Sequence, residues 1–120
     1  MNRELTRLLL SLGITANYTG FDYTLYAVLL AAEDPARLVQ VTKNLYPAVA
    51  SRFHSTAGRV EQNIRHAAEL AWKTNPRMLQ DIAGYPLIRR PRASQFIAIL
   101  TAEYNKLLAR EDPDGQQRLF

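Results

Sequence analysis

Apolar residues recur along most of this chain with the spacing of an amphipathic α-helix. The first apolar stripe, spaced i, i+3, i+4 and i+7, consists of Leu5, Leu8, Leu9 and Leu12. Gly13 follows this stripe as a stop signal. No segment shows sustained alternation of polar and apolar residues, so we expect little or no β-sheet. The pattern predicts an all-α fold, a compact bundle of about six helices.

Capping residues and prolines indicate where the next two helices begin. We expect a second helix over residues 21–33, with four apolar side chains inward: Leu25, Tyr26, Leu29 and Leu30. Asp34 is a helix cap, and Pro35 fits the first helical position, where its missing N–H group costs nothing. A third helix then runs to about residue 44 and carries Leu38, Val39 and Val41.

The middle of the chain has the pattern of a short helix, a polar turn and a longer helix. Residues 48–53 fit a helix of under two turns. His54 stands in the turn, where such motifs often have glycine, and either Ser55 or Thr56 caps the longer helix, which reaches residue 72 or 73. This is the helix-turn-helix pattern, whose second helix enters the major groove of DNA. We expect the motif at about residues 47–73.

A helical wheel divides the longer helix into a buried stripe and a polar face. The buried stripe is Val60, Ile64, Ala67 and Ala71. The polar face and its flanks carry Arg59, Glu61, Gln62, Arg65, His66 and Glu69. Arg recognises guanine, Gln recognises adenine, and Glu accepts a hydrogen bond from cytosine. The same face is also typical of a solvated helix in which Glu61 and Arg65 form an i, i+4 ion pair, so the pattern leaves both interpretations open.

The last third of the chain predicts two further helices separated by a basic loop. Asn75 and Pro76 are a cap and a first-turn proline for a helix that ends at Gly84. Residues 85–92, with two prolines and three arginines, should form an extended and exposed loop. Ser94 then caps a last helix with an apolar face of Phe96, Ile97, Leu100, Tyr104, Leu107 and Leu108. We expect one domain over residues 1–111 and a flexible tail over 112–120.

Composition excludes several classes of chemistry. The chain has 120 residues, no cysteine and two histidines, so it offers no disulfide, no Cys-ligated zinc and no thiol nucleophile. It shows neither paired carboxylates on one face nor a nucleophile with a base, and no cofactor motif. We therefore expect no enzymatic activity, no cofactor and no metal site. With no membrane span and no signal peptide in the sequence, we expect a cytoplasmic location.

The basic residues are concentrated in the middle third of the sequence. The formal net charge is +4, and residues 52–92 hold eight basic and three acidic side chains. The densest cluster is Arg89, Arg90 and Arg92. Such a loop suits DNA phosphates or the minor groove, and a merely solubilising loop is the alternative.

Four short motifs also point to a known family. They are Leu-Tyr-Pro at 45–47, Arg-Val-Glu at 59–61, Ile-Arg-His-Ala at 64–67 and Ser-Gln-Phe-Ile-Ala at 94–98. With these motifs, the chain resembles the C-terminal DNA-binding effector domain of the stage-zero sporulation protein A family over about residues 5–108. The resemblance implies a six-helix domain that binds short double-stranded DNA boxes of the TGTCGAA type and regulates transcription in spore-forming bacteria. It also implies contacts with RNA polymerase.

The resemblance implies roles for residues of the longer helix. In the family, this helix contacts bases through a Glu, an adjacent Arg and a second Arg one turn later. Glu61 and Arg65 match two of these positions, whereas Gln62 stands where the family has Arg, and Asn63 replaces a small apolar residue. Loss of a guanine contact, or an adenine preference in its place, follows from Gln62. We therefore expect Glu61, Gln62 and Arg65 to contact bases.

Further residues are expected to contact the DNA backbone or to flank it. They are Ser51, Arg52, Ser55, Thr56, Arg59, His66, Arg89, Arg90 and Arg92. The hydroxyl groups and amides at the turn suit phosphate contacts, and simple capping is the alternative for the hydroxyls.

Partners and regulation follow from the same resemblance. Family members normally carry an N-terminal receiver domain, and a chain that starts at Met1 is expected to have none, by nature or by excision. Such a domain could compete with a full-length regulator for its boxes. A weak or DNA-assisted homodimer is expected through apolar edges of the last helix, Phe96, Leu100 and Leu107 on one side and Ile99 on the other. The alternative function is a helical protein-interaction module that binds a regulator or RNA polymerase.

Overall fold

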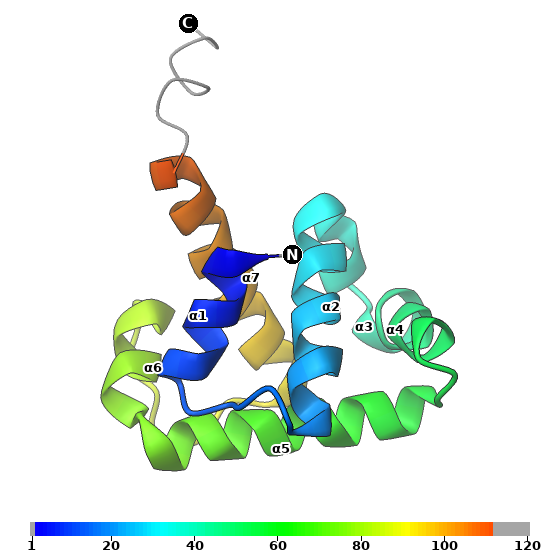
Figure 1. The fold of residues 1–120 in the computed structure, drawn as a ribbon, viewed down its shortest axis with the longest axis horizontal. Helices are drawn as coiled ribbons and strands as arrows, with labels where there is room; N and C mark the ends of the chain where they lie inside the picture. Colours follow the sequence, from blue (N-terminus) through cyan, green and yellow to red (C-terminus); the bar gives the residue numbers. More distant parts are fainter. Residues whose placement is uncertain (1, 112–120) are drawn as a thin grey trace, which may run out of the picture.

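The computed structural model describes residues 2–111, and within them it contains helices and no strand (Figure 1). The elements are α1 (Arg3–Ser11), α2 (Thr19–Glu33), the 3₁₀ helix η1 (Pro35–Leu38), α3 (Val41–Asn44), α4 (Tyr46–Arg52), α5 (Ala57–Thr74), α6 (Pro76–Ala83) and α7 (Ala93–Glu111). The all-α prediction is confirmed. The predicted tail, 112–120, lies outside the described residues.

Helix α5 forms the base of the bundle, and the other long helices stand on one side of it (Figure 1). Helix α2 packs against both α5 and α7, and α7 also packs against α1. Each of these helices contributes fully enclosed side chains to one core, among them Leu9, Val28, Ile64 and Phe96. Helices α4 and α6 contact opposite ends of α5. This arrangement fixes α5 from one side and leaves its outer side free.

The predicted inward face of α2 is wrong. Its enclosed residues are Thr24, Ala27, Val28 and Ala31. The four side chains that we expected there, Leu25, Tyr26, Leu29 and Leu30, are half-buried and pack against the edge of the core. Helix α2 is apolar on nearly every side, so its pattern does not single out one face. Apart from Phe21 near the start of the helix, the buried residues of α2 are small or medium-sized, because α2 is in contact with both α5 and α7.

The predicted third helix is also wrong as a continuous element. The chain forms η1, leaves helical geometry at Gln40, with φ −136° and ψ 79°, and then makes the single turn α3. Val39, one of the three apolar residues of the predicted third helix, directly precedes this break and is 81% exposed. The Arg37 guanidinium donates a hydrogen bond of 2.5 Å to the Asn44 carbonyl and thereby spans the break.

Most predicted helix ends are confirmed, and one start is corrected. Asn75 caps α6 by accepting a hydrogen bond from the Met78 N–H group, and Gly84 ends that helix in the left-handed region, with φ 76°. Helix α7 begins at Ala93, and the Phe96 N–H group donates to the Arg92 carbonyl at 2.8 Å. Ser94 therefore lies within the first turn of α7 and is not its cap.

The apolar face of α7 is used almost entirely by the chain's own core. Phe96, Leu100 and Ile99 are at most 5% exposed. The apolar edges that we expected to serve a second copy are therefore closed at these three positions. Leu107 is half-buried, and Leu108, predicted for the inner face, is 39% exposed.

Candidate nucleic-acid interface

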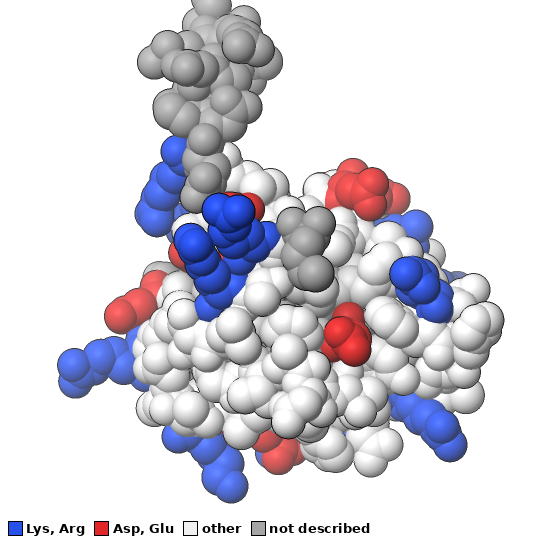
Figure 2. All heavy atoms as spheres, in the orientation of Figure 1, with Lys and Arg blue, Asp and Glu red and all other residues white. Residues whose placement is uncertain are grey.

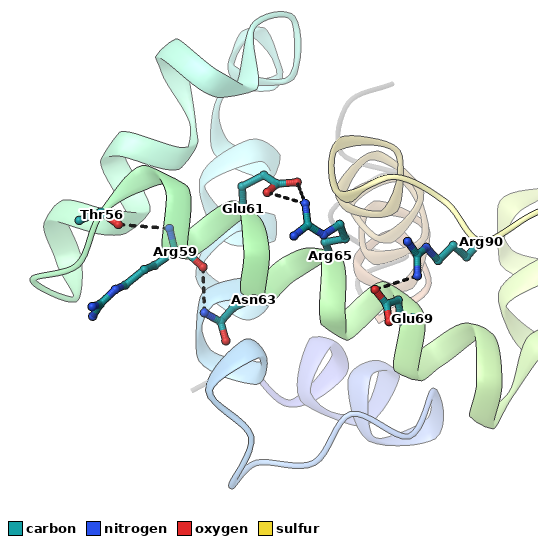
Figure 3. A network of polar contacts seen from close by, with 7 residues as sticks. All are labelled: Thr56, Arg59, Glu61, Asn63, Arg65, Glu69 and Arg90. Carbon is teal, nitrogen blue, oxygen red and sulfur yellow. Dashed lines mark hydrogen bonds and ion pairs between the residues drawn. The ribbon is translucent and has the colours of Figure 1, made fainter.

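The turn between α4 and α5 has the geometry that a helix-turn-helix requires. The Ser55 N–H group donates to the Ala50 carbonyl at 2.9 Å, which reverses the chain directly after α4. His54 adopts φ 54°, a left-handed conformation that glycine usually supplies. Thr56, not Ser55, caps α5, because its hydroxyl accepts a hydrogen bond from the Arg59 N–H group at 3.2 Å (Figure 3). The predicted helix–turn–helix order is confirmed.

The inner side of α5 is anchored by the stripe that the sequence predicts. Its enclosed residues are Val60, Ile64, Ala67, Ala68 and Ala71. Phe53 joins α4 to α2, because its ring lies 5.3 Å from the ring of Tyr23 and 5.8 Å from that of Tyr26. This apolar packing sets the rotation of α5 and thus decides which side chains it presents outward.

The outer side of α5 presents polar groups over its first three turns. Gln62, Arg59 and His66 are exposed. The Arg65 guanidinium lies 3.2 Å from a carboxylate oxygen of Glu61, and the two residues form the i, i+4 ion pair seen in Figure 3. Both side chains are more than a third exposed, so this pair contributes only about 0.3–0.5 kcal/mol. A bidentate Arg–guanine contact is worth about 1–3 kcal/mol, so opening the ion pair is no obstacle to base contact.

A groove of about 570 Å³ lies beside this face of α5. It is lined by Val41, Thr42, Tyr46, Glu61, Arg65, Arg89, Arg90, Pro91, Arg92, Ala93 and Ser94. Arg90 is held to α5 by an ion pair of 2.8 Å with Glu69 (Figure 3). The fold therefore brings the three arginines of the predicted loop together with two of the three predicted base-contacting residues.

Basic side chains are not distributed evenly over the surface of the molecule. On the face shown in Figure 2, Lys and Arg lie mostly around the rim, and the middle is largely uncharged. The groove differs, because Arg65 and three loop arginines share its lining. With four arginines and one glutamate in its lining, the groove has a net positive charge, which suits a polyanion.

Tyr46 closes the floor of the groove next to Glu61. It is 4% exposed, and burial, assisted by the nearby Glu61 charge, raises its pKa to about 12. On the other flank of α5, burial and the charge of Glu69 raise the pKa of Tyr18. Both phenols therefore keep their protons to a higher pH than an ordinary tyrosine does.

The remaining predicted residues occupy several different environments. Ser51 and Thr56 are exposed, whereas the Ser55 hydroxyl is enclosed by protein and forms no hydrogen bond within residues 2–111. The Arg52 guanidinium lies 5.9 Å from the ring of Tyr26 and 5.6 Å from that of its neighbour Phe53. None of these residues lines the groove, and neither do Arg59, Gln62 or His66.

Comparison with known proteins places this chain in a family. The family model described as "Sporulation initiation factor Spo0A C terminal" matches residues 5–104. The chain belongs to this family. The family is a DNA-binding effector domain of a sporulation regulator and is not an enzyme family. The matched range includes the whole α4–α5 motif, the groove and most of α7. Double-stranded DNA is accordingly the ligand class of this Spo0A C-terminal domain.

None of the described helices combines the length and the apolar character that crossing a bilayer needs. Among residues 2–111, no three His, Asp or Glu side chains lie close enough to hold a metal ion together.

The sequence does not identify three residues that contact predicted site residues or hold the basic loop: Tyr46, Glu69 and Gln80. Tyr46 and Glu69 interact with predicted residues, as described above. Gln80 of α6 holds the start of the basic loop through both ends of its side-chain amide, which donates to the Tyr85 carbonyl and accepts from the Leu87 N–H group. No sequence signal identifies Gln80, because its role depends on where the loop folds back.

Proposed function

We propose that this domain is a sequence-specific transcriptional regulator that places the N-terminal half of α5 in the major groove of double-stranded DNA. The observation that carries the proposal is the outer face of α5, with exposed Gln62 and the weak, partly exposed ion pair of Glu61 and Arg65, next to a turn of helix-turn-helix geometry. Membership of the Spo0A C-terminal family supports the DNA ligand. Residues in the first turns of a recognition helix contact base edges in such motifs.

Base recognition is assigned to Glu61, Gln62 and Arg65. Arg65 suits guanine, Glu61 suits cytosine, and Gln62 suits adenine. The boxes are of the TGTCGAA type, with the preference at one position altered by Gln62. Asn63 does not join this set, because its side-chain amide donates to the Arg59 carbonyl of its own helix at 2.8 Å.

Backbone contacts are assigned to the residues around this centre. Ser51, Arg52, Thr56, Arg59 and His66 flank the exposed start of α5, and Arg89, Arg90 and Arg92 flank the groove. The Ser55 hydroxyl is enclosed, so we assign its contribution to the backbone N–H group alone or to a local rearrangement of the turn. The proposal also includes contacts with RNA polymerase and a DNA-assisted dimer. The proposed location is cytoplasmic and nucleoid-associated.

Fluorescence anisotropy on labelled duplexes tests this function. Duplexes with one box, two boxes or a scrambled box are titrated at several salt concentrations. We expect tighter binding to the boxes and an affinity that falls steeply with salt, with a slope of about 0.9 per phosphate contacted. Equal binding to all three duplexes would contradict sequence specificity. Absence of binding at low salt would favour the alternative, a protein-interaction module for a regulator or RNA polymerase.

Charge reversal at Arg65 separates base contact from general attraction. Arg65→Glu is expected to lower box affinity at least tenfold, because it removes one base contact of about 1–3 kcal/mol and adds repulsion. Arg77→Glu, an exposed position on α6, makes the same change in net charge and is the matched control. Equal losses of box affinity in the two variants would mean that Arg65 contributes only its positive charge and no base contact. Gln62→Arg should shift preference from adenine to guanine at one box position.

A further inference from the structure

The basic loop between α6 and α7 is fixed at both ends. At its start, the Gln80 amide bonds to the Tyr85 carbonyl and to the Leu87 N–H group, the latter at 2.8 Å. The Tyr85 hydroxyl also accepts a hydrogen bond of 3.0 Å from the Gln95 amide. Towards its end, Arg90 is paired with Glu69 at 2.8 Å. The loop is therefore held in one conformation before any ligand arrives.

This conformation presents an apolar side chain to solvent. Leu87 is half-buried and Pro91 is buried, so these two residues attach the loop to the body of the domain. Ile88 points away from the body and is 87% exposed, the largest exposed fraction among the large apolar residues of the described chain. Its neighbour Arg89 is exposed as well. A β-branched apolar side chain thus stands at the tip of the loop, directly before two arginines.

The loop also has a definite place relative to α5. Glu69 follows Glu61 by eight residues, which is about 12 Å along the helix axis. Since base contacts come from the first turns of the recognition helix, Glu69 lies where α5 leaves the major groove. The major groove is about 12 Å wide, so a loop attached at Glu69 meets the sugar-phosphate backbone and the minor groove next to it.

We propose that Ile88 inserts into the minor groove beside the site of α5 and bends the DNA, while Arg89 contacts the walls of that groove. The inference rests on the proposed function. Proteins that bind the minor groove combine arginines with apolar wedges, isoleucine among them, which partly unstack a base step and bend the duplex towards the major groove. The fixed loop supports this role, because its side chains need little ordering on binding.

A duplex carrying fluorescent donor and acceptor groups at its two ends measures the bend by energy transfer. We expect the wild-type domain to shorten the end-to-end distance of a box duplex. Ile88→Ala is expected to bind the duplex about tenfold more weakly and to leave it nearly straight, whereas Ile88→Leu retains most of the bend. Val39→Ala is the matched control, because Val39 is β-branched and 81% exposed but lies between η1 and α3.

The outcomes separate this inference from the proposed function. If the wild-type domain binds the box and leaves it straight, or if Ile88→Ala bends it as well as wild type, the wedge is refuted and the proposed function stands. If neither the wild-type domain nor any variant binds DNA at low salt, both the wedge and the proposed function are refuted, and a protein surface becomes the partner for Ile88. Netropsin, which occupies the minor groove, should reduce the affinity of the wild-type domain more than that of Ile88→Ala, and equal effects would contradict minor-groove insertion.

Discussion

Helix α2 approaches α5 so closely at Gly20 that a single methyl group should disturb the contact. Gly20 is buried in the first turn of α2. A Cβ atom at this position would lie 2.8 Å from the backbone oxygen of Asn63 in α5 and 2.4 Å from a ring carbon of Tyr18. The tyrosine ring can turn aside, but the α5 backbone is held by its own enclosed stripe. We therefore predict that Gly20→Ala destabilises the domain.

A second glycine allows the clash to be measured by itself. Gly58 lies in the first turn of α5, and a Cβ atom there would meet nothing within 4 Å. Both Gly→Ala changes restrict the unfolded chain equally and should stabilise by about 0.4–1 kcal/mol where no strain arises. Overpacking costs about 1–3 kcal/mol. The difference between the two variants in free energy of unfolding should therefore be about 1–3 kcal/mol, with Gly58→Ala the more stable.

Urea denaturation of both variants, followed by circular dichroism, gives this difference. With a slope of about 1–3 kcal/mol per molar urea, the two midpoints should differ by roughly 1 M. Gly20→Ala should also weaken DNA binding more than its loss of stability explains, because it moves α5 relative to the bundle. Equal midpoints for the two variants would refute the close packing of α2 on α5 at this point.

Two further predictions concern pH and the turn. The pKa of Tyr46 is about 12 in the folded domain, and its ordinary value is 10.0. As pH rises, the unfolded chain therefore loses this proton first. The contribution of the Tyr46 phenol to the free energy of unfolding is complete below pH 10 and is lost as pH rises towards 12. Urea titrations across this range should show that decline in wild type and a smaller one in Tyr46→Phe. His54, with φ 54°, should tolerate glycine with little change in stability, whereas His54→Val should cost about 1–3 kcal/mol by thermal unfolding, and equal stability of the two variants would contradict strain there.

Local signals were sufficient for most helix ends, because a cap acts on neighbouring N–H groups. Thr56 and Asn75 both accept the hydrogen bonds that their sequence context predicts, and Gly84 ends α6 as expected. The face of α2 and the break at Gln40 were not predictable in the same way. An evenly apolar helix takes its orientation from its neighbours, and the break at Gln40 separates two short elements, η1 and α3, that pack on each other.

The candidate site also has one part that the sequence predicts and one part that depends on the tertiary fold. The outer face of α5 was predictable, because a buried stripe on a helix determines the opposite side. The groove was not, because it requires residues 89–92 to return beside α5 from the far side of α6. The pairing of Arg90 with Glu69 and the bracing of the loop by Gln80 depend on that return, and neither follows from spacing along the chain.

The ion pairs of α5 bear on which residues attract DNA by charge and which residues are proposed to recognise its sequence. Glu61 offsets Arg65, and Glu69 offsets Arg90, so these pairs add little positive charge to the surface around them. General attraction to phosphates must therefore come from other cations, among them Arg59, Arg89 and Arg92, which are exposed and form no ion pair within residues 2–111. Gln62 is exposed and uncharged, so its replacement should change stability by no more than about 0.5 kcal/mol. Under the proposed function, a substitution at position 62 should therefore change base preference and leave the scaffold and the general affinity for DNA unchanged.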